Sequence, residues 1–385
     1  MQSRLGLNAL FLHFPFSGTG RYVGQLIAGI DQFVEPVLIG ARAFPPDPSV
    51  VSARPVQLLQ SPFDRLPRSL AKIWFEQVAL PSAATRSRVD LVHYPYFAAP
   101  VWRRQPTVVT VHDLVPIVRP EYRRTAGQRL YTALVSRGVQ AADRILTDSW
   151  ASAGDLQRLL GVSKAKIRVI PLAVDARFRP LATSEEADWA RRVLATHEVD
   201  GPYVLYLGGL DRRKNVERLI EAFAALKRDR NVPHQLLIVG ALRAGEPFFY
   251  DPRPDLARLG IAGSVRFLGA VGDDDVRALH CCADAFVFPS LYEGFGLPPL
   301  EALACGAPVV CSLASSLPEV VGEAGLLFDP TDPLALADTL GRVLTDSALR
   351  EDLRRRGPVQ AAAFRWDTTV AATAQVYREV AELAS

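Results

Sequence analysis

The sequence predicts an α/β protein made of two doubly wound domains, each built on a parallel sheet. Short apolar runs alternate with helical patterns, pause over Asp175–Gly201, and then begin again. Several of these runs are apolar throughout, which is typical of strands buried on both faces of a parallel sheet. A chain of 385 residues is long enough for two or three separate cores. We therefore expect helices on both faces of two sheets.

In the first half, the predicted strands are Leu5–Leu10, Val37–Ile39, Leu91–His93, Thr107–Val111, Arg144–Thr147 and Ile167–Ile170. The main helical patterns lie at Gly20–Ile30, Gln128–Ala141 and Trp150–Leu160. Ser149 is suited to cap the start of the last helix, and Gly161 is suited to end it. These elements predict an N-terminal domain over residues 1–175.

In the second half, the predicted strands are Tyr203–Leu207, Leu236–Val239, Val265–Leu268, Ala285–Phe288 and Val309–Cys311. The predicted helices are Val216–Arg228, Asp274–Cys281, Leu300–Ala304 and Leu334–Leu344. They form a second domain over residues 176–365. Ligands of such folds bind beyond the carboxyl ends of the strands, so we expect the site in a cleft between the two halves.

The composition is that of a globular protein in a reducing compartment. Apolar residues make up 49% of the chain and charged residues 22%. The four cysteines include no CxxC pair, which favours free thiols and a cytoplasmic location. Leu5–Leu12 follows an arginine, as in a secretion signal, but polar residues interrupt it and a core strand is the better interpretation. No apolar stretch of the sequence approaches the ~20 residues of a membrane span.

The net charge of +3 conceals an asymmetry between the halves. Met1–Asp175 holds 21 lysines and arginines against 12 acidic residues, a formal charge of +9, whereas the remaining residues carry −6. This division suggests that the first half faces an anionic partner. We expect no nucleic acid among the partners.

The segment Tyr292–Gly306 (YEGFGLPPLEALACG) has the strongest chemical signal. A glycine turn and two prolines precede a helix, and such a helix start offers free N–H groups and a positive dipole end to a phosphate. Glu293 stands before the turn and Glu301 within the helix, and each carboxylate can accept hydrogen bonds from a pair of sugar hydroxyls. The alternative is a capped surface helix with two ordinary glutamates.

A basic turn follows the first strand of the second half. In Tyr203–Ile220 the strand ends at Gly208-Gly209, and Arg212-Arg213-Lys214 precedes the next helix. Guanidinium and ammonium groups at a strand end suit a diphosphate. A solvated basic turn is the alternative.

Two segments of the first half also follow strands. Ser17–Gly24 (SGTGRYVG) is not the dinucleotide fingerprint, and no acidic residue follows at the expected distance, so a redox enzyme is disfavoured. Its glycines still allow a ligand to approach the backbone closely, although a plain tight turn is the alternative. His112 ends a strand, where α/β active sites are built, and Asp113 could orient its ring. A lone histidine is otherwise more often structural.

The run Asp273-Asp274-Asp275 invites a metal interpretation. We reject it because the run precedes a helical pattern, where acidic residues serve as the N-cap and first turn of a helix. No metal and no cofactor is expected.

With these segments in view, the chain resembles glycosyltransferase family 4, particularly its bacterial mannosyltransferase-like branch. The resemblance covers most of the chain and rests on GTGRYVGQL, VHDLVPIVRPEY, ADRILTDSWASAGDL, LYLGGLDRRKNVERLIEAF, EGFGLPPLEALACGAPVV and SSLPEVVGEAGLLFDP. It implies the GT-B fold and a last helix, Trp366–Leu383 within residues 366–385, that returns to the N-terminal domain.

The resemblance also implies roles for individual residues. Glu293 would bind the donor sugar, and Glu301 the nucleotide ribose. Lys214, with Arg213, would neutralise the diphosphate. His112 would contact the transferred sugar. The backbone would bind the donor at two glycine turns, which are formed by Gly18, Thr19 and Gly20 and by Gly294, Phe295, Gly296 and Leu297. Many relatives carry an arginine where this chain has Gly209, so the assignment of Arg213 is weaker than that of Lys214.

These roles imply a retaining, metal-independent hexosyltransferase that uses a nucleotide sugar as its donor. The resemblance favours mannose from GDP-mannose, with dTDP-rhamnose and UDP-hexoses as alternatives, and a glycan or polyprenyl-diphosphate-linked acceptor in bacterial surface polysaccharide assembly. The sequence offers no evident acid and nucleophile pair of the glycosidase kind. A sugar-nucleotide epimerase and a non-catalytic nucleotide-sugar sensor remain as further alternatives.

The basic half is the expected acceptor half. Five arginines could face an anionic membrane surface, which would place the enzyme peripherally at the inner face of the cell membrane: Arg103, Arg104, Arg119, Arg123 and Arg124. Arg65–Leu80 has helical spacing, with Leu66, Leu70, Ile73 and Trp74 on one side, and is expected to face the core.

Overall fold

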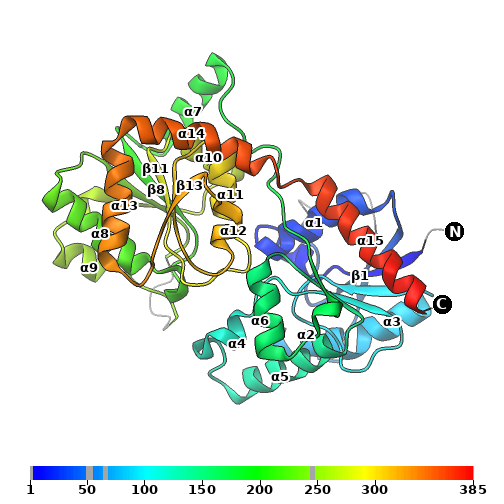
Figure 1. The fold of residues 1–385 in the computed structure, drawn as a ribbon. Coiled ribbons are helices and arrows are strands. Elements are labelled where there is room, and N and C mark those ends of the chain that lie inside the picture. Colours follow the sequence, from blue (N-terminus) through cyan, green and yellow to red (C-terminus); the bar gives the residue numbers. More distant parts are fainter. Residues whose placement is uncertain (1–2, 49–54, 64–67, 243–247, 385) are drawn as a thin grey trace. The chain divides into compact units, whose positions relative to one another are not determined.

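The computed structural model describes residues 3–48, 55–63, 68–242 and 248–384 (Figure 1). The chain divides into two compact units. Unit 1 comprises Met1–Leu172 with Arg365–Ser385, and unit 2 comprises Ala173–Phe364. The final helix, α15 (Trp366–Ala384), therefore belongs with the first part of the chain, from which unit 2 separates it in sequence.

Within the described part of unit 1, seven strands form a wholly parallel sheet in the order β3-β2-β1-β4-β5-β6-β7. The strands are β1 (Arg4–Asn8), β2 (Glu35–Ala41), β3 (Val56–Leu59), β4 (Leu91–Tyr94), β5 (Thr107–Thr110), β6 (Arg144–Thr147) and β7 (Ile167–Val169). The other helical segments are η1 (Leu10–His13), α1 (Gly18–Ile30), α2 (Arg68–Trp74), η3 (Phe75–Ala79), α3 (Leu80–Arg86), α4 (Val115–Val118), η4 (Pro120–Tyr122), α5 (Ala126–Ala141), α6 (Trp150–Leu160) and η5 (Lys164–Lys166). The order reverses at β1 and β4, as in a doubly wound fold.

The described part of unit 2 repeats this plan with a six-stranded parallel sheet in the order β10-β9-β8-β11-β12-β13. The strands are β8 (Tyr203–Leu207), β9 (Gln235–Val239), β10 (Val265–Gly269), β11 (Ala285–Phe288), β12 (Val309–Ser312) and β13 (Gly325–Phe328). The helical segments are α7 (Ser184–Thr196), η6 (Arg212–Lys214), α8 (Val216–Asp229), α9 (Arg253–Arg258), η7 (Ala262–Ser264), α10 (Asp273–Cys282), α11 (Leu297–Ala304), α12 (Leu317–Val321), α13 (Pro333–Thr345) and α14 (Ser347–Ala361). The prediction of two doubly wound α/β domains is confirmed.

The core of each sheet consists of the apolar runs that predicted its strands. β4, β5, β11 and β12 are buried along their whole length. Helix ends follow local chemistry as well. Ser149 accepts the N–H of Ser152 at the start of α6, and Gly161 ends that helix in the left-handed conformation, as predicted.

Two local expectations are corrected, and the predicted start of one helix lies outside the described residues. The acidic run does form the first turn of α10, but Gly272 is the N-cap. The helix expected over Arg65–Leu80 begins at Arg68 among the described residues, which exclude Arg65 and Leu66. It does not turn the predicted side to the core: Leu70 is exposed, whereas Ala71 and Phe75 are buried. The π-helical turn η3 interrupts the regular spacing on which that expectation rested.

Candidate active site

The basic turn of unit 2 lies beyond the carboxyl end of β8. The single turn η6 carries Arg212, Arg213 and Lys214, and Asn215 ends it at φ 58° before α8 begins. Arg212 is exposed, whereas only 9% of Lys214 is exposed. The turn thus directs Lys214 inward, where its ammonium lies 4.9 Å from the centre of the Phe288 ring.

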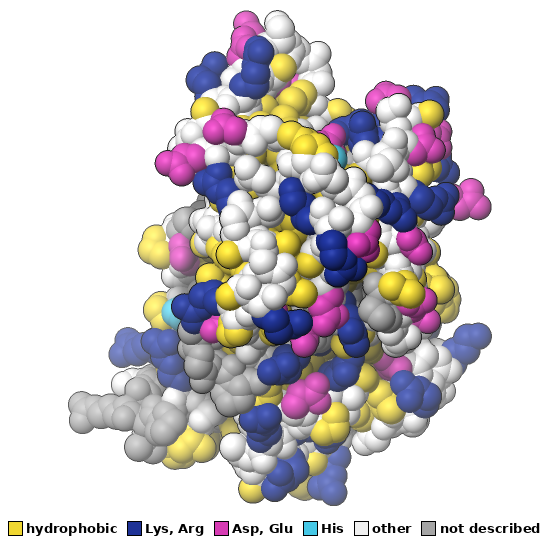
Figure 2. All heavy atoms as spheres, turned by 90° about the vertical axis from the view of Figure 1, so that its left-hand side faces the viewer, with side chains coloured by type: hydrophobic (Ala, Val, Ile, Leu, Met, Phe, Trp, Pro, Cys, Tyr) yellow, Lys and Arg dark blue, Asp and Glu magenta, His cyan; other side chains and the backbone are white. Residues whose placement is uncertain are grey.

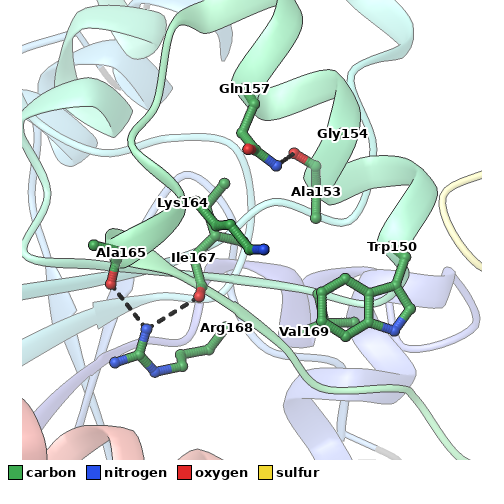
Figure 3. Close-up of a pocket in the computed structure, with 9 residues that line it drawn as sticks. All are labelled: Trp150, Ala153, Gly154, Gln157, Lys164, Ala165, Ile167, Arg168 and Val169. Carbon is green, nitrogen blue, oxygen red and sulfur yellow. Dashed lines mark hydrogen bonds between the residues drawn. The ribbon is translucent and has the colours of Figure 1, made fainter.

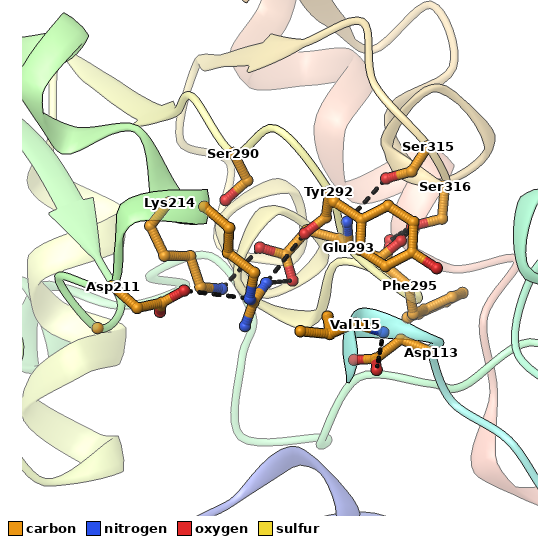
Figure 4. A network of polar contacts seen from close by, with 12 residues as sticks. Asp113, Val115, Asp211, Lys214, Ser290, Tyr292, Glu293, Phe295, Ser315 and Ser316 are labelled. Atoms are coloured by element: carbon orange, nitrogen blue, oxygen red, sulfur yellow. Dashed lines mark hydrogen bonds and ion pairs between the residues drawn. The ribbon is translucent and has the colours of Figure 1, made fainter. Parts of the chain in front are cut away.

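Glu293 forms ion pairs with Lys214 and Arg213, and Figure 4 shows the contact with Lys214. Its Oε1 lies 2.7 Å from Nζ of Lys214, and its Oε2 lies 2.9 Å from a guanidinium nitrogen of Arg213. Arg213 also contacts Asp211 at 3.1 Å and donates to the Tyr292 carbonyl at 2.9 Å. Two carboxylates therefore balance two cations, and we call Asp211, Arg213, Lys214 and Glu293 the ionic cluster.

The cluster fixes the charge of Glu293. Its burial opposes ionisation, but the adjacent charges of Lys214 and Arg213 dominate and lower the pKa of Glu293 to about 2. Sequence reasoning assigned Glu293 to the sugar and the cations to the diphosphate. The structure places the Glu293 carboxylate in direct contact with both cations.

The glycine turn after β11 lies directly after Glu293 in the chain. The Glu293 N–H donates to the Ser315 hydroxyl at 2.8 Å, and the Ser316 hydroxyl donates to the carbonyls of Glu293 and Phe295. Gly296 has φ 124°, and a side chain there would also meet Leu317 at 2.9 Å, so glycine is required.

Helix α11 begins at Leu297, with prolines in its first turn, and not at Leu300 as expected. Pro298 and Pro299 carry no N–H, and the Leu300 N–H donates to the Gly296 carbonyl at 3.2 Å, so the first turn offers an anion little beyond the Leu297 N–H and the positive dipole end. Glu301 lies one turn further along and is buried. The helix start therefore offers an anion its dipole more than its N–H groups, and phosphate binding stays a prediction.

In unit 1, the predicted glycine turn is the start of α1. Ser17 caps the helix by accepting the Gly20 N–H at 3.0 Å, so α1 begins at Gly18 and not at Gly20. Gly18 is exposed, Thr19 is half-buried, and Gly20 is buried. A side chain at Gly20 would lie 2.0 Å from the Phe14 carbonyl oxygen, which explains that glycine structurally.

His112 lies just beyond β5, and its carboxylate partner is not Asp113. Nδ1 of His112 lies 2.7 Å from Oδ2 of Asp148, which follows the neighbouring strand β6. Asp113 instead accepts the N–H of Val115 at 3.0 Å. Nε2 of His112 lies 3.1 Å from the Pro95 carbonyl oxygen.

Sequence reasoning missed Asp148, Asp211, Ser315 and Ser316. A usable signal existed for Asp148, because it is the first residue after a predicted strand, as is required at the carboxyl edge of a parallel sheet. The two serines lie within the quoted SSLPEVV segment, but nothing in their spacing reveals that they face Glu293.

A separate hollow of about 740 Å³ lies between α6 and β7 in unit 1 (Figure 3). Trp150 and Lys164 border it over an apolar floor that includes Ile167 and Val169. It contains none of the residues assigned from the sequence. Over the described ranges, no group of three or more acidic, histidine or cysteine side chains could hold a metal ion. None of the described helices is long and apolar enough to cross a bilayer.

Two doubly wound units, each built on a parallel sheet, are the architecture of the GT-B class of glycosyltransferases. The family described as "Glycosyl transferases group 1" matches residues 191–360, and "Glycosyltransferase Family 4" matches residues 16–178. The chain belongs to glycosyltransferase family 4.

Two sequence relatives and one solved structure are similar over much of the chain. O-antigen chain mannosyltransferase B of Escherichia coli is 35% identical over 77% of this chain and 76% of its own length. The serotype-specific mannosyltransferase WbdA of Escherichia coli is 30% identical over 68% of this chain, which spans only 32% of WbdA. The structure of sucrose-phosphate synthase from Thermosynechococcus elongatus covers all of both chains with a TM-score of 0.78 and 26% identity.

Proposed function

We propose that this glycosyltransferase moves mannose from GDP-mannose, with retention of the α configuration and without a metal, to a glycan or lipid-linked acceptor in surface polysaccharide assembly. The observation that carries the proposal is the ionic cluster beside the start of α11. The choice of mannose is supported by the mannosyltransferases among the relatives, one of which acts on an O-antigen chain.

The chemistry follows from the charges that develop during transfer. As the anomeric C–O bond breaks, negative charge accumulates on the departing diphosphate. Lys214 and Arg213 can meet that charge together with the positive dipole end of α11, and preorganised groups of this kind contribute a few kcal/mol each when water is excluded. The two cations occupy the role that a divalent metal fills in other transferases.

Glu293 has two duties in this scheme. Its carboxylate holds Lys214 and Arg213 in place, and its low pKa keeps it ionised as an acceptor for hydroxyls of the donor sugar. Glu301 is assigned to the ribose and Gly18–Gly20 to the donor. In the proposed front-face reaction the acceptor hydroxyl attacks on the side of the leaving group, and the departing phosphate takes its proton.

The deciding experiment measures donor turnover by the purified chain with GDP-mannose, dTDP-rhamnose, UDP-glucose and UDP-galactose. We expect slow hydrolysis of GDP-mannose without an acceptor and faster turnover of GDP-mannose when a mannan-like acceptor is added. EDTA should leave this turnover unchanged. The proton NMR spectrum of the first product should show an α linkage. Preference for another donor would overturn the mannose assignment. A β linkage would overturn retention, loss of activity in EDTA would overturn metal independence, and turnover that ignores acceptors would favour an epimerase.

We further propose that unit 1 meets the acceptor at an anionic membrane surface in the cytoplasm. Trp102 is 85% exposed and is followed by the exposed residues Arg103 and Arg104. An indole beside guanidinium groups suits the boundary between lipid headgroups and water. Of the other predicted arginines, Arg124 is exposed but Arg119 and Arg123 are only partly exposed, so Trp102–Arg104 is the stronger candidate.

A further inference from the structure

Both ring nitrogens of His112 face atoms that can only accept hydrogen bonds at neutral pH. Nδ1 lies 2.7 Å from a carboxylate oxygen of Asp148, and Nε2 lies 3.1 Å from the carbonyl oxygen of Pro95. A neutral imidazole carries one N–H and one lone pair, so it would leave one nitrogen facing an oxygen without a proton between them. Only the imidazolium, with two N–H groups, satisfies both contacts.

The surroundings of the ring support the same charge state. Burial alone lowers the pKa of His112, but the charge and hydrogen bond of Asp148, with smaller contributions from Asp113 and the Pro95 carbonyl, raise it above the ordinary value. Tyr22 of α1 covers the ring in an edge-to-face contact at 5.0 Å. His93 of β4 adds no competing charge, because burial and the charge of His112 lower the pKa of His93 to about 3.

Asp148 itself is held by the fold. It follows β6, is buried, and immediately precedes Ser149, the N-cap of α6. The positive end of that helix therefore lies next to the Asp148 carboxylate. The same helix end also holds the histidine backbone, since the Ser152 hydroxyl donates to the His112 carbonyl at 3.1 Å. One helix start thus fixes both members of the pair.

We propose that Asp148 is a positioning residue that holds His112 in one orientation as an imidazolium, so that His112 acts as a fixed cation and not as a general base. The catalytic part of this inference rests on the proposed function. A ring that donates from both nitrogens has no lone pair for the acceptor's proton. That proton must go elsewhere, which agrees with the departing phosphate as its destination.

The first test needs no substrate. Nitrogen-15 NMR of histidine-labelled protein reports the charge of each ring, and His112→Gln identifies the His112 signals. We expect both ring nitrogens of His112 to have imidazolium shifts at pH 7 in the wild-type protein. Asp148→Asn should move the titration of His112 to lower pH, whereas Asp113→Asn, the matched loss of a nearby carboxylate, should move it less. A neutral ring in the wild type, or a larger effect of Asp113→Asn, would overturn the inference.

The second test uses transfer kinetics once a donor is known. Asp148→Asn should lower kcat by about tenfold or more, since one preorganised electrostatic group contributes roughly 100- to 1000-fold. The alkaline limb of its pH–rate profile should move to lower pH. In a His112→Gln background, Asp148→Asn should cost little more, because it acts through the histidine.

An equal loss in both backgrounds would show that Asp148 acts structurally, and melting curves of all variants establish that they fold. If no sugar nucleotide is turned over, the proposed function fails while the NMR result still decides the charge of His112.

Discussion

Glu293 carries more of the site's structure than its expected role as a sugar ligand suggests. Two cations bond its two oxygens, and its own backbone N–H is bound by Ser315. Because the folded-state pKa lies below the ordinary value, the ionised carboxylate stabilises the fold fully above about pH 4.5. That stabilisation is lost as pH falls toward about 2.

We therefore predict that Glu293→Gln removes an acid-sensitive part of the stability. The difference in free energy of unfolding between wild type and variant, from urea titrations, should narrow by about 3 kcal/mol between pH 5 and pH 2. Glu351→Gln, which removes an exposed carboxylate of α14, should show no comparable change. A difference that stays constant with pH would contradict the prediction.

Neighbouring cations of one turn provide a matched test of the diphosphate assignment. Lys214→Met removes the buried ammonium of the ionic cluster and should lower kcat by roughly 100- to 1000-fold, because a preorganised charge is lost from the transition state. Arg212→Met removes an exposed charge from the same turn and should leave kcat within about twofold. Steady-state kinetics with the preferred donor measures kcat for both variants. Similar decreases in kcat would contradict the diphosphate assignment and would indicate that the turn is only a solvated basic segment.

At the scale of elements, two of the four glycines of α1 have opposite constraints. A side chain at Gly20 would collide with the backbone of Phe14 and Pro15, whereas one at Gly24 would meet nothing within 4 Å. The first glycine is thus required by the close approach of the chain before the helix, and the second is not.

Gly24→Ala should raise the free energy of unfolding by about 0.4–1 kcal/mol, since alanine restricts the unfolded chain and favours the helix. Gly20→Ala should lower it by about 1–3 kcal/mol, the usual cost of forcing a group into a packed site. Thermal or urea unfolding measures both. Equal effects would show that the segment before α1 yields to admit the side chain.

Elements that carry an uninterrupted buried run could be predicted from the sequence, and others could not. The bounds of β6, β8 and β11 agree with the predicted ranges. The edge strands β3 and β13 were missed because they are largely half-buried or exposed and so lack that signal.

Helix α14 was missed for a different reason. It is rich in charge and contains Pro358, which ordinarily argues against a helix interior. Tertiary packing stabilises α14 instead. Its Gly357 packs so closely against α11 that a side chain there would lie 2.8 Å from the Leu303 carbonyl oxygen.

The chemical site shows the same division between local and long-range information. The motifs located Lys214, Glu293 and the glycine turn because each lies in a local pattern at a strand end, but the contact between Lys214 and Glu293 spans 79 positions and was not predicted. The pairing of His112 with Asp148 spans 36 positions and depends on β5 and β6 being neighbours in the sheet. Side-chain spacing along the chain cannot reveal such a pair, but strand order can.

At the scale of the whole molecule, the two halves of the sequence differ in net charge, but charges of both signs are mixed on the face drawn in Figure 2. Figure 2 shows basic side chains interspersed with acidic and apolar ones over the face that it draws. A net charge of +3 would attract an anionic membrane only weakly. Membrane binding should therefore depend on a local group such as Trp102–Arg104.

We predict that the protein binds vesicles containing anionic phospholipid and that binding falls as salt is raised. Arg104→Gln should weaken binding about fivefold, the equivalent of about 1 kcal/mol per basic residue, and Trp102→Ala should weaken it further. Trp150→Ala, at another tryptophan that is 68% exposed, is the control. Sedimentation with vesicles measures these affinities, and salt-insensitive binding or an equal effect of the control would count against this surface.

The return of α15 to unit 1 has a consequence for biosynthesis. Tyr377 of this helix bonds His93 of β4 at 2.7 Å, and Val370 packs on Gly29 of α1. A ribosome makes unit 2 before it makes this helix, so unit 2 can fold while the earlier part of unit 1 still lacks its last element. The first unit to be synthesised is therefore the last to be completed. A message that ends about twenty codons early would leave the His112 half of the enzyme open to misfolding.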